Sequence, residues 1–329
     1  MKFFKKLTVL PFLLLTIFIS CSSDDEKDND LPEIVTLTFN QESAQDQMGD
    51  FADNAMEVYN DKVWSFAGRN NSINEIFNDE VWHSDNGIAW VSNANNVTTG
   101  RRGTTLTKFN NKLWIIGGED NDGNALQDIW SSSDGGTWTL EVNTAPFGAI
   151  QFHSTVVFNG KLYVIVGNPS TGHTEVWSSS NGTTWTQNTN NAADAFFGRG
   201  GHKAVVFNNT IYVIGGESDT RLNDVWKSTN GTDWTQIAIN GDVLPRITGH
   251  TATVYNNKVW VIGGRQGTAD VSNAIYYSSD MITWVKYEET TIPFNPIAFH
   301  NTLNYNNALW IFGGYTETGL SGAIWKITE

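Results

Sequence analysis

The feature that most constrains this chain is a repeat that returns six times with a period near 50 residues. It is clearest at 202–236, which reads HKAVVFNNTIYVIGGESDTRLNDVWKSTNGTDWTQ. Short runs of β-branched and aromatic residues, bounded by Asn, Gly and Asp, predict four strands here. One small four-stranded sheet cannot cover both of its apolar faces alone. Each copy therefore needs neighbours that are built the same way.

Three landmark positions recur through the chain. The glycine that closes the second strand falls at Gly68, Gly118, Gly167, Gly216, Gly264 and Gly314. The aromatic of the third strand falls at Trp82, Trp130, Trp177, Trp226, Tyr276 and Trp325. The Trp of the fourth strand falls at Trp90, Trp138, Trp185, Trp234 and Trp284, and it has no sixth copy. Four strands in a unit of this length predict an all-β, six-bladed β-propeller.

The missing sixth outer strand has a replacement near the N-terminus. The run IVTLTF at 34–39 is an isolated strand pattern that precedes the first repeat, and the last repeat ends after three strands. We predict that this N-terminal strand completes the last blade as its outermost strand. The ring would then be closed, with only short, protected edges.

The repeat resembles the kelch repeat. The resemblance lies in the Gly-Gly pair after an apolar run, the aromatic and Trp downstream, and the PRITGH stretch at 245–250. It covers roughly residue 54 to the C-terminus. Because kelch propellers serve many functions, the resemblance implies a fold and leaves the function open.

Composition narrows the class of protein. The chain has 329 residues, of which 40% are hydrophobic, and this fits one propeller rather than several domains. The net charge of −15 disfavours nucleic acid as a partner. Cys21 is the only cysteine, so no intramolecular disulfide can form. We expect a monomer.

The N-terminus reads as a targeting segment. Lys2, Lys5 and Lys6 precede an apolar run at 7–19, which is too short to span a bilayer comfortably. Ser20-Cys21 follows and resembles a bacterial lipoprotein signal with Cys21 lipidated. The SSDDEKDND stretch after it resembles the acidic export signal of some Bacteroidetes surface lipoproteins. An ordinary secretory signal followed by a solvated acidic tether is the alternative.

These readings divide the chain into three parts. They are a signal peptide at 1–20, an acidic tether at 21–33 with the lipidated Cys21, and a propeller at 34–329. The expected location is the outer membrane, with the protein anchored by lipid and exposed at the surface. An anchor that faces the periplasm remains the alternative.

The arginines gather at one face of the predicted propeller. All seven fall in the two sets of loops that share one face, namely Arg69, Arg101, Arg102, Arg199, Arg221, Arg246 and Arg265. Arginine suits bidentate recognition of carboxylate, sulfate or phosphate. The sequence therefore predicts a face that binds an acidic glycan or a protein partner. In the alternative, some arginines hold loops by pairing with Glu119, Glu217 or Asp219, and Arg199 and Arg246 belong to the kelch scaffold.

Aromatic residues divide into two groups. All fourteen Trp occupy repeat positions, where they are expected to fill the space between blades. Six aromatics lie outside the pattern and are candidates for stacking on a ligand: Phe77, Phe147, Phe196, Phe197, Phe294 and Tyr315.

Four histidines occupy one slot of the repeat, at His153, His202, His250 and His300. Zinc needs all its ligands within about 2.1 Å of one point, whereas packed sheets stand about 10 Å apart. We therefore predict hydrogen bonding within the scaffold, with no metal and no cofactor.

Catalysis is the competing function. Glu217 and Arg221 stand in GGESDTRL, and Glu119 holds the matching place in another blade. A carboxylate among arginines can abstract a proton from a sugar carbon. The pattern has a limited similarity to kelch-type N-acetylneuraminate epimerases, and implies an epimerase, lyase or hydrolase acting on acidic sugars in the central pocket. An adhesion scaffold without a small ligand is the third possibility.

Each function predicts a different site. An enzyme requires a deep central pocket with Glu217 or Glu119 desolvated. A glycan-binding protein requires an open groove with exposed aromatics beside the arginines. A protein-binding module requires a broad apolar patch on the rim.

Overall fold

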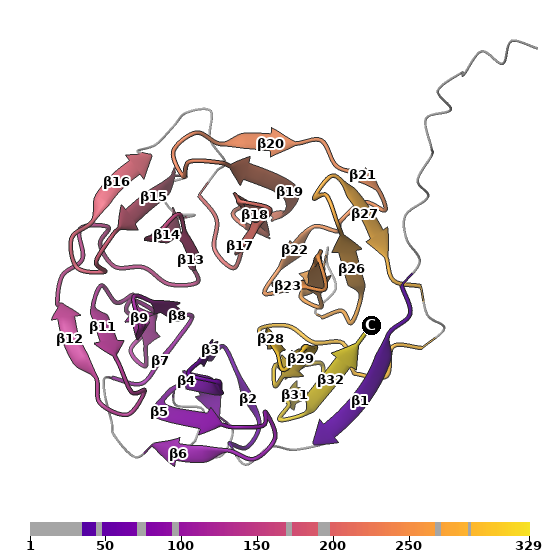
Figure 1. Cartoon of the computed structure of the whole chain (residues 1–329), viewed down its shortest axis with the longest axis horizontal. Helices are drawn as coiled ribbons and strands as arrows, with labels where there is room; N and C mark the ends of the chain where they lie inside the picture. Colours follow the sequence, from indigo (N-terminus) through magenta and orange to yellow (C-terminus); the bar gives the residue numbers. More distant parts are fainter. Residues whose placement is uncertain are drawn as a thin grey trace, which may run out of the picture. The chain divides into compact units, whose positions relative to one another are not determined.

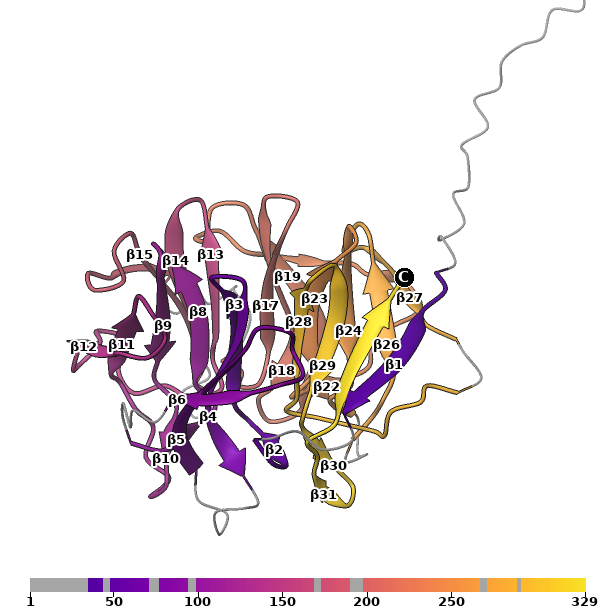
Figure 2. The ribbon, with the colours of Figure 1, turned by 60° about the horizontal axis from the view of Figure 1, so that its bottom comes forward.

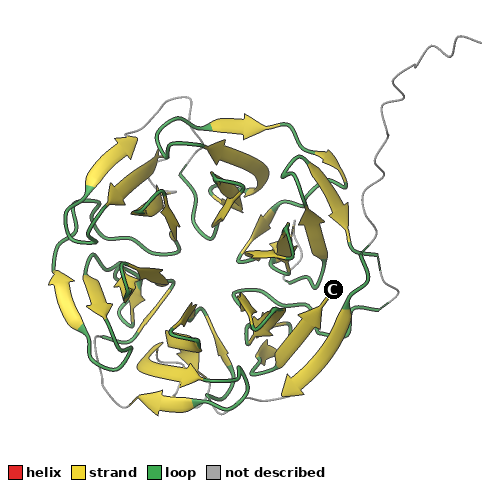
Figure 3. Ribbon diagram, in the orientation of Figure 1, coloured by secondary structure: helices red, strands yellow, loops and turns green. Residues whose placement is uncertain are grey.

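The computed structural model places six blades around one axis, which confirms the all-β, six-bladed propeller (Figure 1). It describes residues 35–43, 48–70, 77–93, 99–168, 173–189, 198–266, 271–288 and 291–329. Throughout these residues the elements are strands and turns, without a helix (Figure 3). The predicted signal peptide, the tether and Cys21 lie outside the described residues.

Each blade is a four-stranded antiparallel sheet that runs outward from the axis. In blade two the order from inside is β8 (Thr105–Phe109), β9 (Lys112–Ile116), β11 (Ile129–Ser132) and β12 (Thr139–Val142). Blade one comprises β3 (Ala55–Tyr59), β4 (Lys62–Asn70), β5 (Phe77–Ser84) and β6 (Val91–Asn93). Blade three comprises β13 (Ser154–Phe158), β14 (Lys161–Asn168), β15 (His173–Ser179) and β16 (Thr186–Thr189). Blade four comprises β17 (Lys203–Phe207), β18 (Thr210–Glu217), β19 (Arg221–Ser228) and β20 (Thr235–Ile237). Blade five comprises β23 (Thr251–Tyr255), β24 (Lys258–Ile262), β26 (Ile275–Ser278) and β27 (Thr283–Lys286).

The sixth blade confirms the predicted closure. Its strands are β28 (Asn301–Tyr305), β29 (Ala308–Phe312), β32 (Ile324–Thr328) and, outermost, β1 (Thr38–Ser43). Strand β1 runs antiparallel to β32, so that the first and last strands share one sheet (Figure 1). The strand begins four residues later than the predicted 34–39. Val35 and Leu37 are buried in the apolar core instead, and the Leu37 N–H donates to the hydroxyl of Tyr287 at 3.2 Å.

Short strands extend the blades at one edge of the ring. They are β2 (Phe51–Ala52), β7 (Arg101–Arg102), β10 (Glu119–Asp120), β22 (Ile247–Thr248), β25 (Arg265–Gln266), β30 (Tyr315–Thr316) and β31 (Gly319–Leu320), with β21 (Asn240–Gly241) beside β27. Figure 2 shows β2, β10 and β30–β31 at the edge opposite the hairpin turns between the two inner strands of each blade.

Those hairpin turns define the first of two faces, here called the Asn-turn face. Each has two residues and begins with an asparagine at positive φ, for example Asn60 at 51° and Asn208 at 45°. Such turns match the twist of the strands that they join, and asparagine tolerates the left-handed backbone. The opposite face carries the seven arginines and is called the arginine face.

Bulky aromatic side chains bind each blade to the next. Trp64 of blade one lies against the outer turn of blade two, where a Cβ on Gly135 would stand 2.2 Å from its ring. Trp114 covers Gly182 of blade three in the same way. The Trp64 indole N–H donates to the carbonyl of Tyr59 at 3.0 Å, and Trp114 repeats this bond with Phe109. These tryptophans fill the space between blades, as predicted.

Candidate functional site

A closed ring of backbone hydrogen bonds surrounds the axis at the arginine-face end. The residue two places before each inner strand has φ between 52° and 64°, and its N–H donates to the equivalent carbonyl of the preceding blade. The six residues are Asp53, Gly103, Phe152, Gly201, Gly249 and Phe299, and the N···O distances run from 2.7 to 3.3 Å. This backbone ring narrows the space at its centre to a cavity of about 50 Å³.

Two phenylalanines add to this closure. Phe152 and Phe299 come from blades three and six, and their ring centroids lie 6.4 Å apart across the axis. Both residues hold a left-handed backbone that costs a non-glycine residue roughly 1–2 kcal/mol. The backbone ring and these two side chains together form the channel floor.

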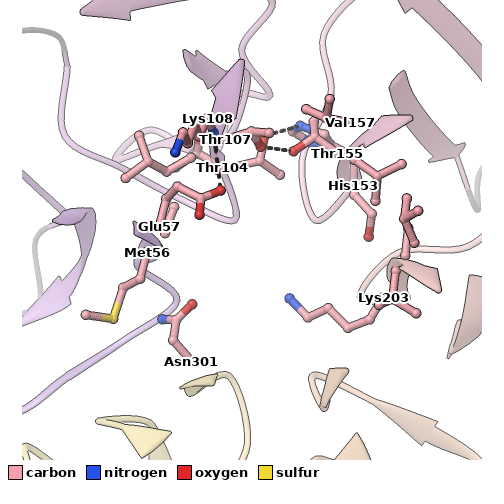
Figure 4. Close-up of a pocket in the computed structure, with 18 of the residues that line it drawn as sticks. Met56, Glu57, Thr104, Thr107, Lys108, His153, Thr155, Val157, Lys203 and Asn301 are labelled. Atoms are coloured by element: carbon pink, nitrogen blue, oxygen red, sulfur yellow. Dashed lines mark hydrogen bonds between the residues drawn. The ribbon is translucent and has the colours of Figure 1, made fainter. Parts of the chain in front are cut away.

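Above the floor lies the channel cavity, a volume of about 590 Å³ lined by β3, β8, β13 and β17 (Figure 4). Lys108 and Val157 line it near the Asn-turn face, and both are exposed. The cavity is therefore a blind pocket that opens on the face opposite the arginines.

The four repeated histidines lie next to the floor and are buried. Burial disfavours the imidazolium and lowers the pKa of His153, His202, His250 and His300 to about 3. Thr105 Oγ1 lies 3.2 Å from His153 Nε2, and His202 Nδ1 lies 3.1 Å from the carbonyl of Arg199. No His, Cys, Asp or Glu groups that could hold a metal ion occur in the described part of the chain.

Two of the predicted ligand arginines are internal scaffold residues. Arg101 and Arg199 are each 1% exposed. Arg101 forms two hydrogen bonds with the Asp128 carboxylate, at 2.7 and 2.9 Å, and a third with the carbonyl of Gly117. Arg199 repeats the arrangement with Asp224 and Gly215. The prediction that these two residues bind a ligand is therefore wrong, because both guanidinium groups are buried against carboxylates of their own blades.

A second pair of arginines surrounds Asp53 and Phe77. Arg102 donates to Glu119 at 2.8 Å, and its guanidinium lies 5.0 Å from the Phe77 ring centroid. Arg69 Nε is 3.6 Å from an Asp53 oxygen and also stacks over Phe77. Burial raises the pKa of Asp53 to about 6, although the charges of Arg102 and Arg69 oppose the rise. Arg69 and Arg102 thus lie against carboxylates of their own face, as in the alternative that some arginines hold loops.

The remaining three arginines come together in blades four and five. Arg221 begins β19, Arg265 begins β25, and β22 pairs with both strands between them. Arg246 directly precedes β22; it is exposed and donates to the carbonyl of Arg221 at 3.0 Å. Glu217 lies 3.9 Å from Arg221. We name Arg221, Arg246 and Arg265 the arginine cluster.

The predicted catalytic carboxylates do not reach the channel cavity. Glu217 has a side chain that is 46% exposed, and Glu119 is paired with Arg102. Neither belongs to the lining of the cavity. Among the stacking candidates, Tyr315 is 43% exposed in β30, whereas Phe196 and Phe197 lie outside the described residues.

Sequence reasoning missed the two charged residues that do line the cavity deep within it, Glu57 and Lys203. Glu57 accepts hydrogen bonds from the N–H groups of Val58 and Lys108, and burial raises its pKa. Lys203 was detectable, because it is the only charged residue at its position in the six repeats.

The fold and the repeat define a kelch-type β-propeller. The KLHDC2/KLHL20/DRC7 Kelch-repeats domain family matches residues 53–264 and 201–328, and the chain belongs to this family. Among solved structures, the chain is similar to "Structure of YjhT", with 18% identity and a TM-score of 0.69 over 87% of this chain and 99% of that one. At this identity the likeness shows the fold alone. No curated protein matches the chain significantly.

Propellers of this class commonly bind protein partners, and the fold supports a binding or interaction module. In the residues that the structure describes, no helix has the length and hydrophobicity needed to cross a membrane.

Proposed function

We propose that this protein is a lipid-anchored surface protein whose arginine face binds an acidic ligand, in the first place an acidic glycan. The observation that carries the proposal is the arginine cluster. Three paired strands of two blades bring these three residues close together on the rim. Arg246 is exposed there, and no described carboxylate pairs with it. Loops on a rigid scaffold are the usual place for binding residues.

The geometry favours binding over catalysis. The Glu217 side chain is 46% exposed, and Glu119 is paired with Arg102; neither lines the channel cavity. Arg246 is instead exposed at the edge, with the half-buried Arg221 and Arg265 nearby, and planar guanidinium groups suit carboxylate or sulfate recognition.

A protein partner is the second candidate, and one observation favours it. Val243 lies three residues before Arg246 and is 65% exposed. An apolar side chain beside the arginine cluster fits an acidic protein surface with an apolar contact at its centre. Glycan binding remains first because the other large exposed hydrophobics among the described residues are scattered over several blades.

A binding screen tests the proposal. The purified protein is screened against neutral, uronate-bearing, sialylated and sulfated glycans. Arg246→Ala and Arg265→Ala are compared with Lys161→Ala, which removes an exposed lysine from the Asn-turn face. Binding restricted to acidic glycans, and weakened at least tenfold by the arginine substitutions alone, is the expected result. If no acidic glycan binds, the glycan proposal fails and an acidic protein partner becomes the object of the search.

The lipid anchor is tested separately through Cys21. In a bacterial host, Cys21→Ala should move the protein from the membrane fraction to the soluble fraction and abolish incorporation of labelled fatty acid. Protease digestion of whole cells then distinguishes surface exposure from a location in the periplasm. Retention of the Cys21→Ala protein in membranes would contradict the anchor.

A further inference from the structure

The position of Lys203 on its inner strand is used differently in the other blades. The equivalent residues are Ala55, Thr105, Ser154, Thr251 and Asn301. Four of these five form a hydrogen bond with the next blade: Thr105 with His153 Nε2, Ser154 with the carbonyl of His202, Thr251 with His300 Nε2, and Asn301 with the carbonyl of Asn54. The position normally joins one inner strand to the next.

Lys203 does not form this hydrogen bond to the next blade. Its side-chain amine forms no hydrogen bond or ion pair with any residue of the described chain, and His250 Nε2 on the next blade has no hydrogen bond to it. The matching Nε2 atoms of His153 and His300 contact the threonine hydroxyl of the preceding blade. At this position blade four therefore carries an amine, whereas four other blades carry a residue that forms a hydrogen bond to the next blade. Proteins break such local rules chiefly at functional sites.

The Lys203 side chain extends into the open centre of the channel cavity (Figure 4). Glu57 lines the same cavity, but its two oxygens accept the backbone N–H groups of Val58 and Lys108, at 2.8 and 3.2 Å. Burial lowers the pKa of Lys203, and the charge of Asp53 opposes this. Lys203 is partly buried, and charges that are shielded from bulk water are normally paired. No carboxylate of the described chain forms an ion pair with this ammonium group.

We propose that the channel cavity is a binding site for a small anion with a single negative charge, held at Lys203 Nζ. The anion enters from the Asn-turn face, because the channel floor closes the other end. A single charge is favoured because Lys203 is the one cation in the interior of the cavity, with Lys108 near the mouth, and because the cavity also contains Glu57, with Asp53 at its floor. The site lies apart from the arginine cluster and does not depend on the function proposed for that cluster.

Titration with simple anions tests the site. The purified protein is titrated with sodium acetate and sodium lactate at constant ionic strength, and binding is followed by saturation-transfer NMR of the methyl protons. Lys203→Thr removes the amine, and Lys161→Thr removes an exposed lysine from the same face. We expect saturable binding that is at least tenfold weaker in Lys203→Thr and unchanged in Lys161→Thr.

Loss of fold does not confuse this test. Threonine occupies the equivalent place in blades two and five, where its hydroxyl contacts the neighbouring histidine. Lys203→Thr should therefore melt at or above the temperature of the native protein. Lys203→Met serves as a second variant with the same expected loss of binding. Equal binding by native protein and both Lys203 variants, or no saturable binding by the native protein, would overturn the proposal.

Discussion

At the scale of single residues, arginine performs two different tasks in this propeller. Arg101 and Arg199 are buried and form two hydrogen bonds each with a carboxylate of their own blade. Although burial acts to raise the pKa of Asp128, hydrogen bonds and charge from Arg101 hold that pKa below its usual value. Arg246 is exposed and contacts only a carbonyl. The first task is structural and the second leaves the guanidinium available to a ligand.

This difference predicts unequal effects of the two substitutions on stability. Arg199→Met leaves the Asp224 carboxylate and the Gly215 carbonyl without their partner, and should lower the free energy of unfolding by about 3–5 kcal/mol. Arg246→Met should change it by less than about 0.5 kcal/mol, as surface substitutions usually do. Urea denaturation of both variants measures the difference. Equal losses in the two variants would show that burial does not separate the two classes.

The sequence located all seven arginines on one face but did not separate the two tasks. The distinction lies in spacing relative to the backbone ring. Arg101 and Arg199 stand two residues before a ring glycine, whereas Arg246 stands three residues before Gly249. That shift of one residue places Ile247, rather than an arginine, in the buried position. Without knowledge of the backbone ring the shift carries no signal, so the sequence alone does not separate the two classes of arginine.

At the scale of elements, the repeat predicted the blades well because every strand is flanked by turn-forming residues. The closing strand was also predicted, but its start was wrong by four residues. The apolar run at 34–39 contributes side chains to the core before it contributes hydrogen bonds to the sheet. Periodicity detects burial, and it does not say which buried residues also pair with a neighbouring strand.

The closing strand should dominate the stability of the last blade. Removing residues 1–43 deletes β1 and exposes the edge of β32, and it also removes Phe39 from its contacts with Tyr287 and Phe294. With Val35 and Leu37 also lost, and each side chain worth roughly 1.5–3 kcal/mol, the free energy of unfolding should fall by several kcal/mol. An exposed edge also promotes aggregation.

The matched comparison is a chain that begins at residue 34 and keeps β1. Thermal melting and light scattering of the two truncated proteins measure the contribution of this strand. If both melt at the same temperature and stay monodisperse, the closure by β1 is energetically unimportant and the interpretation of the sixth blade is incorrect.

At the scale of the whole molecule, the closed channel could not be predicted from the sequence. The backbone ring needs six left-handed residues, and three of them are Asp53, Phe152 and Phe299, which rarely adopt that conformation. Each is held by bonds from both neighbouring blades, so the ring is a property of the assembled propeller. The sequence predicted a binding site at the arginine face, yet the channel cavity opens on the other face.

The assembled propeller also predicts how stability depends on pH. Four buried histidines have pKa values of about 3, below the value of 6.5 for an exposed group. As the pH falls, the unfolded chain therefore binds protons at these histidines before the folded protein does. Their contribution to stability is present above pH 6.5 and is lost as the pH falls toward 3. Asp53 acts oppositely: its pKa of about 6 exceeds 3.8, so its contribution is present below pH 3.8 and is lost as the pH rises through 6. Glu57, whose pKa is also raised, acts in the same sense as Asp53.

Between pH 4 and 6 the unfolded chain should therefore bind about two to three more protons than the folded protein. The free energy of unfolding should rise by about 3–4 kcal/mol per pH unit in this window, since each proton contributes about 1.4 kcal/mol. Urea denaturation at closely spaced pH values measures the slope. His250→Gln should reduce it by about one proton, whereas Asp53→Asn should increase it by about one. A flat profile, or slopes that both substitutions change in the same direction, would mean that the inner histidines are not held neutral by the fold.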